Sequence, residues 1–124
     1  MNYLIDTHIL LWYIIGDKRI KKDTKIIIEE NSNTIYFSNA SLWEIAIKVS
    51  IGKLRLKGSL NDLKNYLKEK RFIILEFDFE DLETLLTLPF HHQDPFDRMI
   101  VSQAQTKSLE IITNDGIIKK YFEK

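Results

Sequence analysis

Residues 94–98 read Asp94-Pro95-Phe96-Asp97-Arg98, and this stretch decides how the rest of the chain is interpreted. Pro95 suits the first position of a helix, where a backbone N–H is not needed. Helical spacing then places Asp97 at the head of an apolar stripe, which continues with Ile100, Val101 and Ala104. A carboxylate on a face that should meet the core is costly unless a positive group lies opposite it. The identity of that positive group decides the function.

The composition is that of a folded chain without an overall charge. The sequence has 124 residues, enough for a single domain (1–124) with a hydrophobic core, and 44% of them are apolar. Basic and acidic residues number 18 each, so the formal net charge is zero. Such a chain has no global attraction for nucleic acid and would need a local basic patch or metal ions to bind it. The absence of cysteine excludes disulfides and thiolate metal ligands.

The N-terminal region lacks the features of a secretory signal. Asp6 follows only a few apolar residues, and no basic region precedes them. The longest apolar run, Ile9 to Ile15, has seven residues and is far too short to span a membrane. We therefore expect a cytoplasmic protein without a membrane partner.

Short strands alternate with helices along the chain. Four β-branched, aromatic or apolar runs predict strands at residues 2–5, 34–37, 72–75 and 110–113. Helices are predicted at residues 9–15, 18–31, 39–51, 59–70, from Asp78 to before Pro89, and from Pro95 onward. Residues 117–122 fit either a last short helix or the start of a strand. This order predicts an α/β fold of three layers, with helices on both faces of a short, mostly parallel sheet.

Acidic residues fall where the predicted strands end. Asp6 directly follows the first strand, Asp115 follows the fourth, and Glu44 lies in the helix after the second. Asp94 and Asp97 open the helix before the fourth strand. Because functional groups of such folds gather at the carboxyl ends of the strands, we expect these acids to meet at one edge of the sheet.

Clustered carboxylates require a neutralising partner. Two unit charges about 4 Å apart repel by roughly 4 kcal/mol at an effective dielectric constant near 20. Protons or a cation must offset this repulsion, and Arg98 and Lys48 are the basic residues beside the acids in these motifs. Ligands that are all oxygen favour Mg²⁺ or Mn²⁺ over zinc. We therefore predict a site for one of these ions.

Each acid considered alone also has a structural explanation. Asp6 and Asp115 suit helix caps or turns, and Asp94 suits the N-cap before a proline. Glu44 could close a capping box or pair with Lys48 four residues on. These alternatives stay open for the individual residues, and the convergence of all of them favours a metal site.

Histidine and lysine residues give weaker signals. His8, His91 and His92 do not form the i, i+4 pair typical of a zinc site on a helix. Lys48 and Lys53 are candidates for contacts with an RNA phosphate backbone, although a solvated surface is the favoured explanation for them.

Together these segments resemble the PIN domain, and more narrowly the VapC-like ribonuclease toxins of toxin–antitoxin pairs. The resemblance covers residues 2 to about 122. Its matching pieces are Tyr3-Leu4-Ile5-Asp6-Thr7-His8, Ser41-Leu42-Trp43-Glu44-Ile45-Ala46-Ile47-Lys48, Gly52-Lys53-Leu54, Leu88-Pro89-Phe90-His91-His92-Gln93-Asp94-Pro95-Phe96-Asp97-Arg98 and Ile112-Thr113-Asn114-Asp115.

The resemblance implies a PIN-like sheet with strand order near 3-2-1-4-5 and an acidic pocket holding one or two Mg²⁺ or Mn²⁺ ions. By position, the metal-site acids would be Asp6, Glu44, Asp97 and Asp115. Asp94 resembles an accessory acid and Thr113 resembles a hydroxyl near the pocket. The family cleaves RNA, commonly tRNA or ribosomal RNA, is inhibited by a cognate antitoxin, and often forms homodimers. The sequence ends at Lys124, so the fifth strand is expected to be short or missing.

The leading hypothesis is a metal-dependent endoribonuclease that hydrolyses RNA phosphodiester bonds. A non-catalytic PIN-like binding module is one alternative. Another is a Mg²⁺-dependent phosphoryl-handling α/β protein, such as a receiver or an aspartyl phosphatase. Against the latter, Asp6 is a single acid and the position two residues later is His8.

Overall fold

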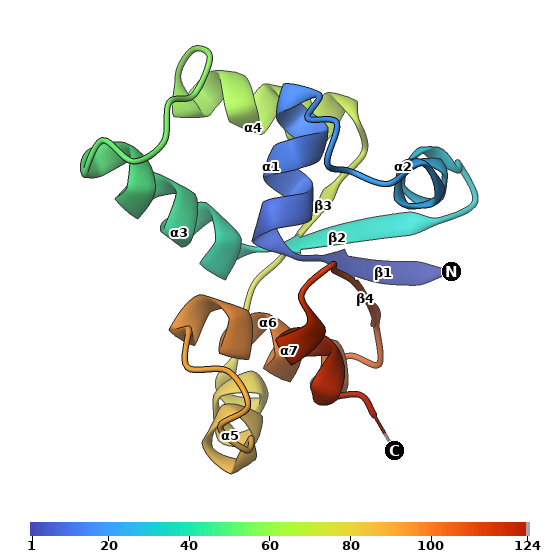
Figure 1. Ribbon diagram of the computed structural model, residues 1–124, viewed down its shortest axis with the longest axis vertical. Coiled ribbons are helices and arrows are strands. Elements are labelled where there is room, and N and C mark those ends of the chain that lie inside the picture. The colour runs from blue at the N-terminus through green and yellow to red at the C-terminus, as the bar shows by residue number, and fades with distance from the viewer. Residues whose placement is uncertain (124) are drawn as a thin grey trace.

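A parallel sheet of four strands lies between two layers of helices (Figure 1). The computed structural model describes residues 1–123. Every strand pairing in it is parallel, and the strand order is β3-β2-β1-β4. The strands are β1 (Asn2–Ile5), β2 (Thr34–Ser38), β3 (Ile73–Leu75) and β4 (Glu110–Ile112). The predicted α/β fold is confirmed, and within residues 1–123 no fifth strand follows β4.

Seven helices cover the two faces of the sheet in the described part of the chain. The first four lie on one side: α1 (Thr7–Ile15), α2 (Lys22–Glu29), α3 (Asn39–Ser50) and α4 (Leu60–Glu69). The other side carries α5 (Phe79–Thr87), α6 (Pro95–Thr106) and α7 (Gly116–Lys120). None of these helices has the length and apolarity that crossing a membrane requires.

The helix predicted for residues 18–31 is four residues too long at its start. The carboxylate of Asp17 accepts hydrogen bonds from the backbone N–H of Arg19 at 2.8 Å and from its guanidinium at 2.7 Å. These local bonds hold residues 17–21 in a turn after Gly16, which ends α1 with a positive φ of 70°. The last segment is the helix α7 rather than a strand, because Asp115 caps its N-terminus.

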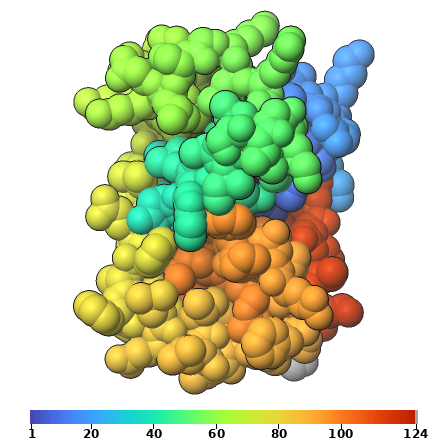
Figure 2. All heavy atoms as spheres, turned by 90° about the vertical axis from the view of Figure 1, so that its left-hand side faces the viewer, coloured from blue at the N-terminus to red at the C-terminus, as the bar shows by residue number. Residues whose placement is uncertain are grey.

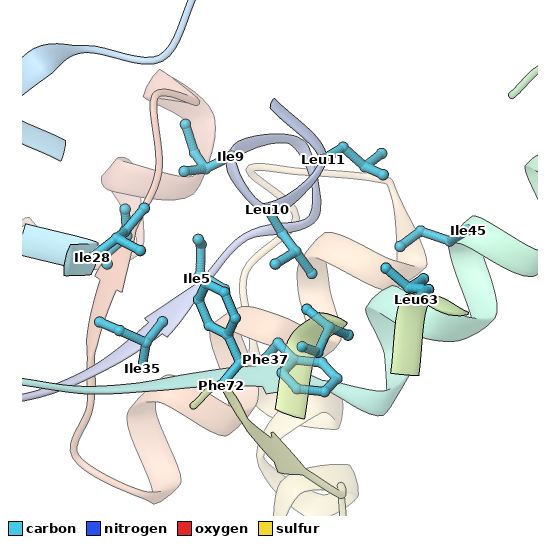
Figure 3. Close-up of a cluster of buried hydrophobic side chains, with 12 residues drawn as sticks. Ile5, Ile9, Leu10, Leu11, Ile28, Ile35, Phe37, Ile45, Leu63 and Phe72 are labelled. Carbon is cyan, nitrogen blue, oxygen red and sulfur yellow. The ribbon is translucent and has the colours of Figure 1, made fainter. Parts of the chain in front are cut away.

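The core has one cluster on each face of the sheet because β1 is covered on both sides. Ile5 packs toward α1 and α4 with Phe37 and Leu10 (Figure 3). Leu4 points the other way and packs with Ile100 of α6. Burying each of these side chains contributes about 1.5–3 kcal/mol. Successive residues of one strand that are buried on opposite faces of the sheet are typical of a parallel sheet between helical layers.

The register of the sheet brings two candidate site segments together. Ile5 at the end of β1 is aligned with Ile112 at the end of β4. The backbone N–H of Asp6 donates to the carbonyl oxygen of Ile112 at 3.0 Å. Asp6 and Thr113 therefore leave the sheet side by side, at the same edge where β2 leads into α3.

Candidate metal centre

Asp94 is the N-cap of α6. Its Oδ1 accepts hydrogen bonds from the backbone N–H groups of Phe96 at 2.9 Å and Asp97 at 3.0 Å. Pro95 occupies the first turn, as predicted from the sequence. This cap fixes the start of the helix and turns Asp97, which is only 5% exposed, toward the edge of the sheet.

Asp6 and Thr113 form a direct contact across the ends of β1 and β4. The Thr113 hydroxyl donates to Oδ2 of Asp6, and it accepts the backbone N–H of Asp115 at 2.9 Å. The other oxygen of Asp6, Oδ1, accepts from the backbone N–H of Ile9 at 2.8 Å and so caps α1. Thr113 thereby links two acids of the edge and holds Asp6 in one orientation.

Two buried carboxylate oxygens at this edge have no hydrogen-bond partner among residues 1–123. They are Oε1 of Glu44 and Oδ1 of Asp97. The second oxygen of Glu44 is 3.0 Å from the ammonium nitrogen of Lys48, one helical turn away. A buried acceptor without a partner is costly, so these oxygens are suited to receive a ligand.

The pKa values of the acids reflect this crowding. Burial raises the pKa of Asp97 to about 7, and the charges of Asp94, Glu44 and Asp6 act in the same direction. Burial likewise raises the pKa of Asp6, against the hydrogen bond from Thr113. The edge therefore carries more negative charge than its own contacts neutralise.

Asp115 differs from these two acids. Burial acts to raise its pKa, but hydrogen bonds from the backbone N–H of Ile117 and from His92 outweigh it, and the pKa is lowered. Oδ1 of Asp115 caps α7 by accepting the N–H of Ile117 at 2.8 Å. Its Oδ2 turns toward the centre.

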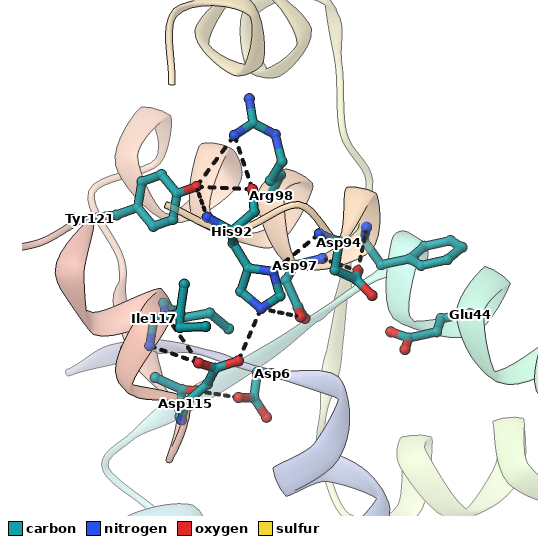
Figure 4. Close-up of polar contacts among 12 residues, drawn as sticks. Asp6, Glu44, His92, Asp94, Asp97, Arg98, Asp115, Ile117 and Tyr121 are labelled. Carbon is teal, nitrogen blue, oxygen red and sulfur yellow. Dashed lines mark hydrogen bonds and ion pairs between the residues drawn. The ribbon is translucent and has the colours of Figure 1, made fainter. Parts of the chain in front are cut away.

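His92 is the residue that the sequence did not identify. Its Nε2 lies 3.0 Å from Oδ2 of Asp97 and 3.1 Å from Oδ2 of Asp115 (Figure 4). One ligand atom from each of these three side chains lies within 4.8 Å of the other two. The basic neighbours predicted from the motifs, Arg98 and Lys48, were therefore an incomplete set. A histidine two residues before the helix cap Asp94 was the available signal.

The side chain of Arg98 contacts the loop between α5 and α6 and makes no hydrogen bond or ion pair with the carboxylates of the site among residues 1–123. Its guanidinium donates to the carbonyl oxygens of Pro89 at 3.0 Å and Leu85 at 3.3 Å, and it lies 4.1 Å from the ring centre of Phe90. It also contacts the hydroxyl of Tyr121 at 3.3 Å, which in turn accepts the backbone N–H of His92 at 2.8 Å. Arg98 thus holds the segment that carries His92.

The structure brings the predicted acids to one edge of the sheet. Asp6, Glu44, Asp94, Asp97 and Asp115 surround a common space, with Thr113 bonded to Asp6 (Figure 4). Lys48 contacts this group of acids through its ion pair with Glu44. Lys53 lies exposed in the turn after α3, where its backbone N–H donates to the carbonyl oxygen of Lys48 at 2.8 Å.

The chain belongs to the PIN domain family, whose profile matches residues 3–123. Among solved structures it is similar to a chain in the crystal structure of VapBC2 from Rickettsia felis bound to a DNA fragment from their promoter. The TM-score is 0.72 with 22% sequence identity, covering 98% of this chain and 93% of that chain. This similarity confirms the fold. No curated protein matches the sequence.

Proposed function

We propose that the protein is a Mg²⁺- or Mn²⁺-dependent endoribonuclease and the toxin of a toxin–antitoxin pair. PIN domains are generally nucleases, which supports the hydrolase class. The observation that carries the metal dependence is the pair of buried oxygens without partners, Glu44 Oε1 and Asp97 Oδ1, beside Asp6. An all-oxygen set with excess negative charge suits a hard divalent cation.

The acids divide into two roles in this proposal. Asp6 and Asp97 bind the ion directly, and Glu44 and Asp115 complete the site directly or through water. Thr113 holds Asp6, as described above. When bound, one or two such ions supply a water of lowered pKa and offset charge on the phosphoryl oxygens.

Basic side chains near the site would guide the substrate. Lys48 reduces the negative charge of Glu44 by their ion pair, and Lys53 is free to contact a phosphate from the exposed turn after α3. Because the net charge of the chain is zero, such local contacts must replace a global attraction for RNA. Structured RNA such as tRNA or ribosomal RNA is the proposed substrate class.

Two protein partners belong to the proposal. The similar structure contains VapBC2, which supports a cognate antitoxin for this chain. An apolar groove of about 730 Å³ between α3 and α4, lined by Leu42, Leu63 and Phe72 among others, gives such a partner an apolar surface. A second copy of the chain would cover the exposed side chains of Phe79 and Leu86 on α5.

The deciding experiment measures cleavage of a fluorescent stem-loop RNA with Mn²⁺. We expect Asp97→Asn and Asp6→Asn to abolish cleavage while the circular dichroism spectrum stays that of the wild type. Glu29→Gln, at the end of α2, is the control and should cut normally. Wild-type cleavage that persists in excess EDTA would refute the metal dependence. Binding of RNA without any cleavage would favour the binding-module alternative, and a stable adduct with acetyl phosphate would favour a phosphoryl-handling protein.

A further inference from the structure

Trp43 and Phe96 form an aromatic pair beside the candidate metal centre. Their ring centres are 5.2 Å apart and their planes meet at 84°, an edge-to-face contact. Each ring directly precedes a site acid in the chain, Trp43 before Glu44 and Phe96 before Asp97. The pair therefore bridges the α3 and α6 segments that deliver those acids.

The indole of Trp43 is open to solvent although it is held in place. The side chain is 60% exposed, whereas Glu44, the next residue, is 5% exposed. In an edge-to-face pair at least one face of the indole is not covered by Phe96. Figure 2 views the molecule from the side on which the teal surface of α3 adjoins the orange surface of α6. Apart from its contact with Phe96, the ring helps to line the apolar groove between α3 and α4.

Other exposed aromatic side chains differ from Trp43. The ring of Phe90 lies against the guanidinium of Arg98 at 4.1 Å, which gives it a structural role. Phe79 opens α5 and is 84% exposed, but its neighbours Asp78 and Glu80 are not acids of the centre. Trp43 thus combines a free ring face with a place beside the site.

We propose that Trp43 stacks on an unpaired nucleobase of the RNA, while Phe96 fixes the orientation of the indole. This inference rests on the proposed nuclease function and specifies its substrate. The acidic centre repels a phosphate backbone, and the net charge of the chain is zero, so a contact that does not depend on charge would add to the local contacts of Lys48 and Lys53. Stacking on an aromatic side chain is such a contact, and it accepts every base.

The stacked base must be unpaired and unstacked on one side. In a duplex, neighbouring base pairs cover the faces of each base, so a protein ring reaches a base face in loops, bulges and single strands. The site therefore selects RNA with an accessible base next to the bond that is cut.

The test uses the intrinsic fluorescence of the indole. The chain has two tryptophans, and Trp12→Phe leaves Trp43 as the single reporter. With Ca²⁺ present to offset the acidic centre, titration with a short single-stranded RNA should quench the fluorescence of this variant. The same RNA annealed to its complement should quench it much less. Equal quenching by both forms would overturn the proposal.

Variants separate stacking from other contacts. Trp43→Ala should weaken binding of a labelled single-stranded RNA by about 5- to 150-fold, and Trp43→Phe should keep most of the affinity. Ile26→Ala removes an apolar side chain of similar exposure, 57%, on α2, and this variant should bind as the wild type does. Unchanged affinity in Trp43→Ala would refute the proposal.

Two further outcomes keep the proposals apart. If the wild type cuts RNA and Trp43→Ala binds and cuts equally well, the stacking proposal is refuted and the nuclease function is still supported. If the wild type neither binds nor cuts RNA, both the stacking proposal and the nuclease function are refuted. Because Trp43 also lines the apolar groove, loss of antitoxin or self-association in Trp43→Ala with unchanged RNA affinity would assign the ring to a protein interface instead.

Discussion

Nε2 of His92 lies 3.0 Å from Oδ2 of Asp97, whose other oxygen, Oδ1, has no hydrogen-bond partner among residues 1–123. The proton on this nitrogen is fixed by the other side of the ring, because Nδ1 accepts the backbone N–H of Asp94 at 3.1 Å. An Nε2 that carries a proton donates to Asp97 and Asp115 and cannot ligate a metal. In this geometry His92 and a metal ion compete for the negative charge of the same two carboxylates, Asp97 and Asp115.

Removing the imidazole should therefore strengthen metal binding. We expect His92→Ala to bind Mn²⁺ about fivefold more tightly, which corresponds to one net hydrogen bond of about 1 kcal/mol. The metal-free variant should unfold at a lower temperature than the wild type, since two carboxylates lose their donor. Calorimetric titration and thermal unfolding in EDTA measure the two effects.

His91→Ala is the matched control for this prediction. His91 packs edge-on against Tyr121 and is not among the three side chains clustered at the centre, so its loss should leave Mn²⁺ affinity unchanged. Weaker Mn²⁺ binding by His92→Ala would contradict the competition and identify His92 as a ligand.

Thr113 should act on the metal through Asp6. Thr113→Val removes the hydroxyl that orients Asp6 and accepts the N–H of Asp115, with little change in shape. Loss of such an orienting contact typically costs 10- to 100-fold in metal affinity. We expect Mn²⁺ affinity to fall within this range for Thr113→Val and to stay near the wild-type value for Thr113→Ser, which keeps the hydroxyl. Equal affinities for the two variants would refute the role.

The positions of the acids were predictable from the sequence because the topology of the sheet determines them. Asp6 and Asp115 follow parallel neighbouring strands, so the edge of the sheet dictates where they meet. His92 was not predictable in this way, since its loop has no regular structure and depends on Arg98 and Tyr121, which lie elsewhere in the chain. The start of α2 was missed for a similar reason, because the bonds between Asp17 and Arg19 compete with the helix.

The raised pKa of Asp97 should make the metal-free protein less stable as pH rises. The folded state holds this proton up to a pKa of about 7, whereas the unfolded chain releases it near the ordinary value of 3.8. Between these values the folded state binds more protons, so the free energy of unfolding falls with increasing pH. Asp6 has a raised pKa and contributes in the same direction.

Asp97→Asn should flatten this profile. In EDTA the variant and the wild type should unfold at similar temperatures near pH 4.5, and the variant should become the more stable of the two by pH 7.5. The difference is a few kcal/mol at most. Added Mn²⁺ should restore the stability of the wild type at pH 7.5 and have little effect on the variant. Parallel profiles for the two proteins in EDTA would show that Asp97 does not retain its proton.

Arg98 should stabilise the loop beside the candidate metal centre without contacting its carboxylates. Its planar guanidinium donates to carbonyl oxygens of Leu85, Leu88 and Pro89 at 3.0–3.4 Å, a set that the single ammonium of lysine cannot match. We expect Arg98→Lys to lower the free energy of unfolding by about 2–4 kcal/mol, measured in urea, because buried carbonyl groups lose charged donors.

The same substitution should also alter metal binding. The Tyr121 hydroxyl that Arg98 contacts accepts the N–H of His92, so a loosened Arg98 frees the ring that competes for Asp97. Arg98→Lys should then bind Mn²⁺ more tightly, in the direction expected for His92→Ala. Tyr121→Phe keeps Arg98 and removes one link, and should give a smaller change of the same sign. A loss of stability without any change in Mn²⁺ affinity would show that Arg98 stabilises the fold but does not influence metal binding through the His92 loop.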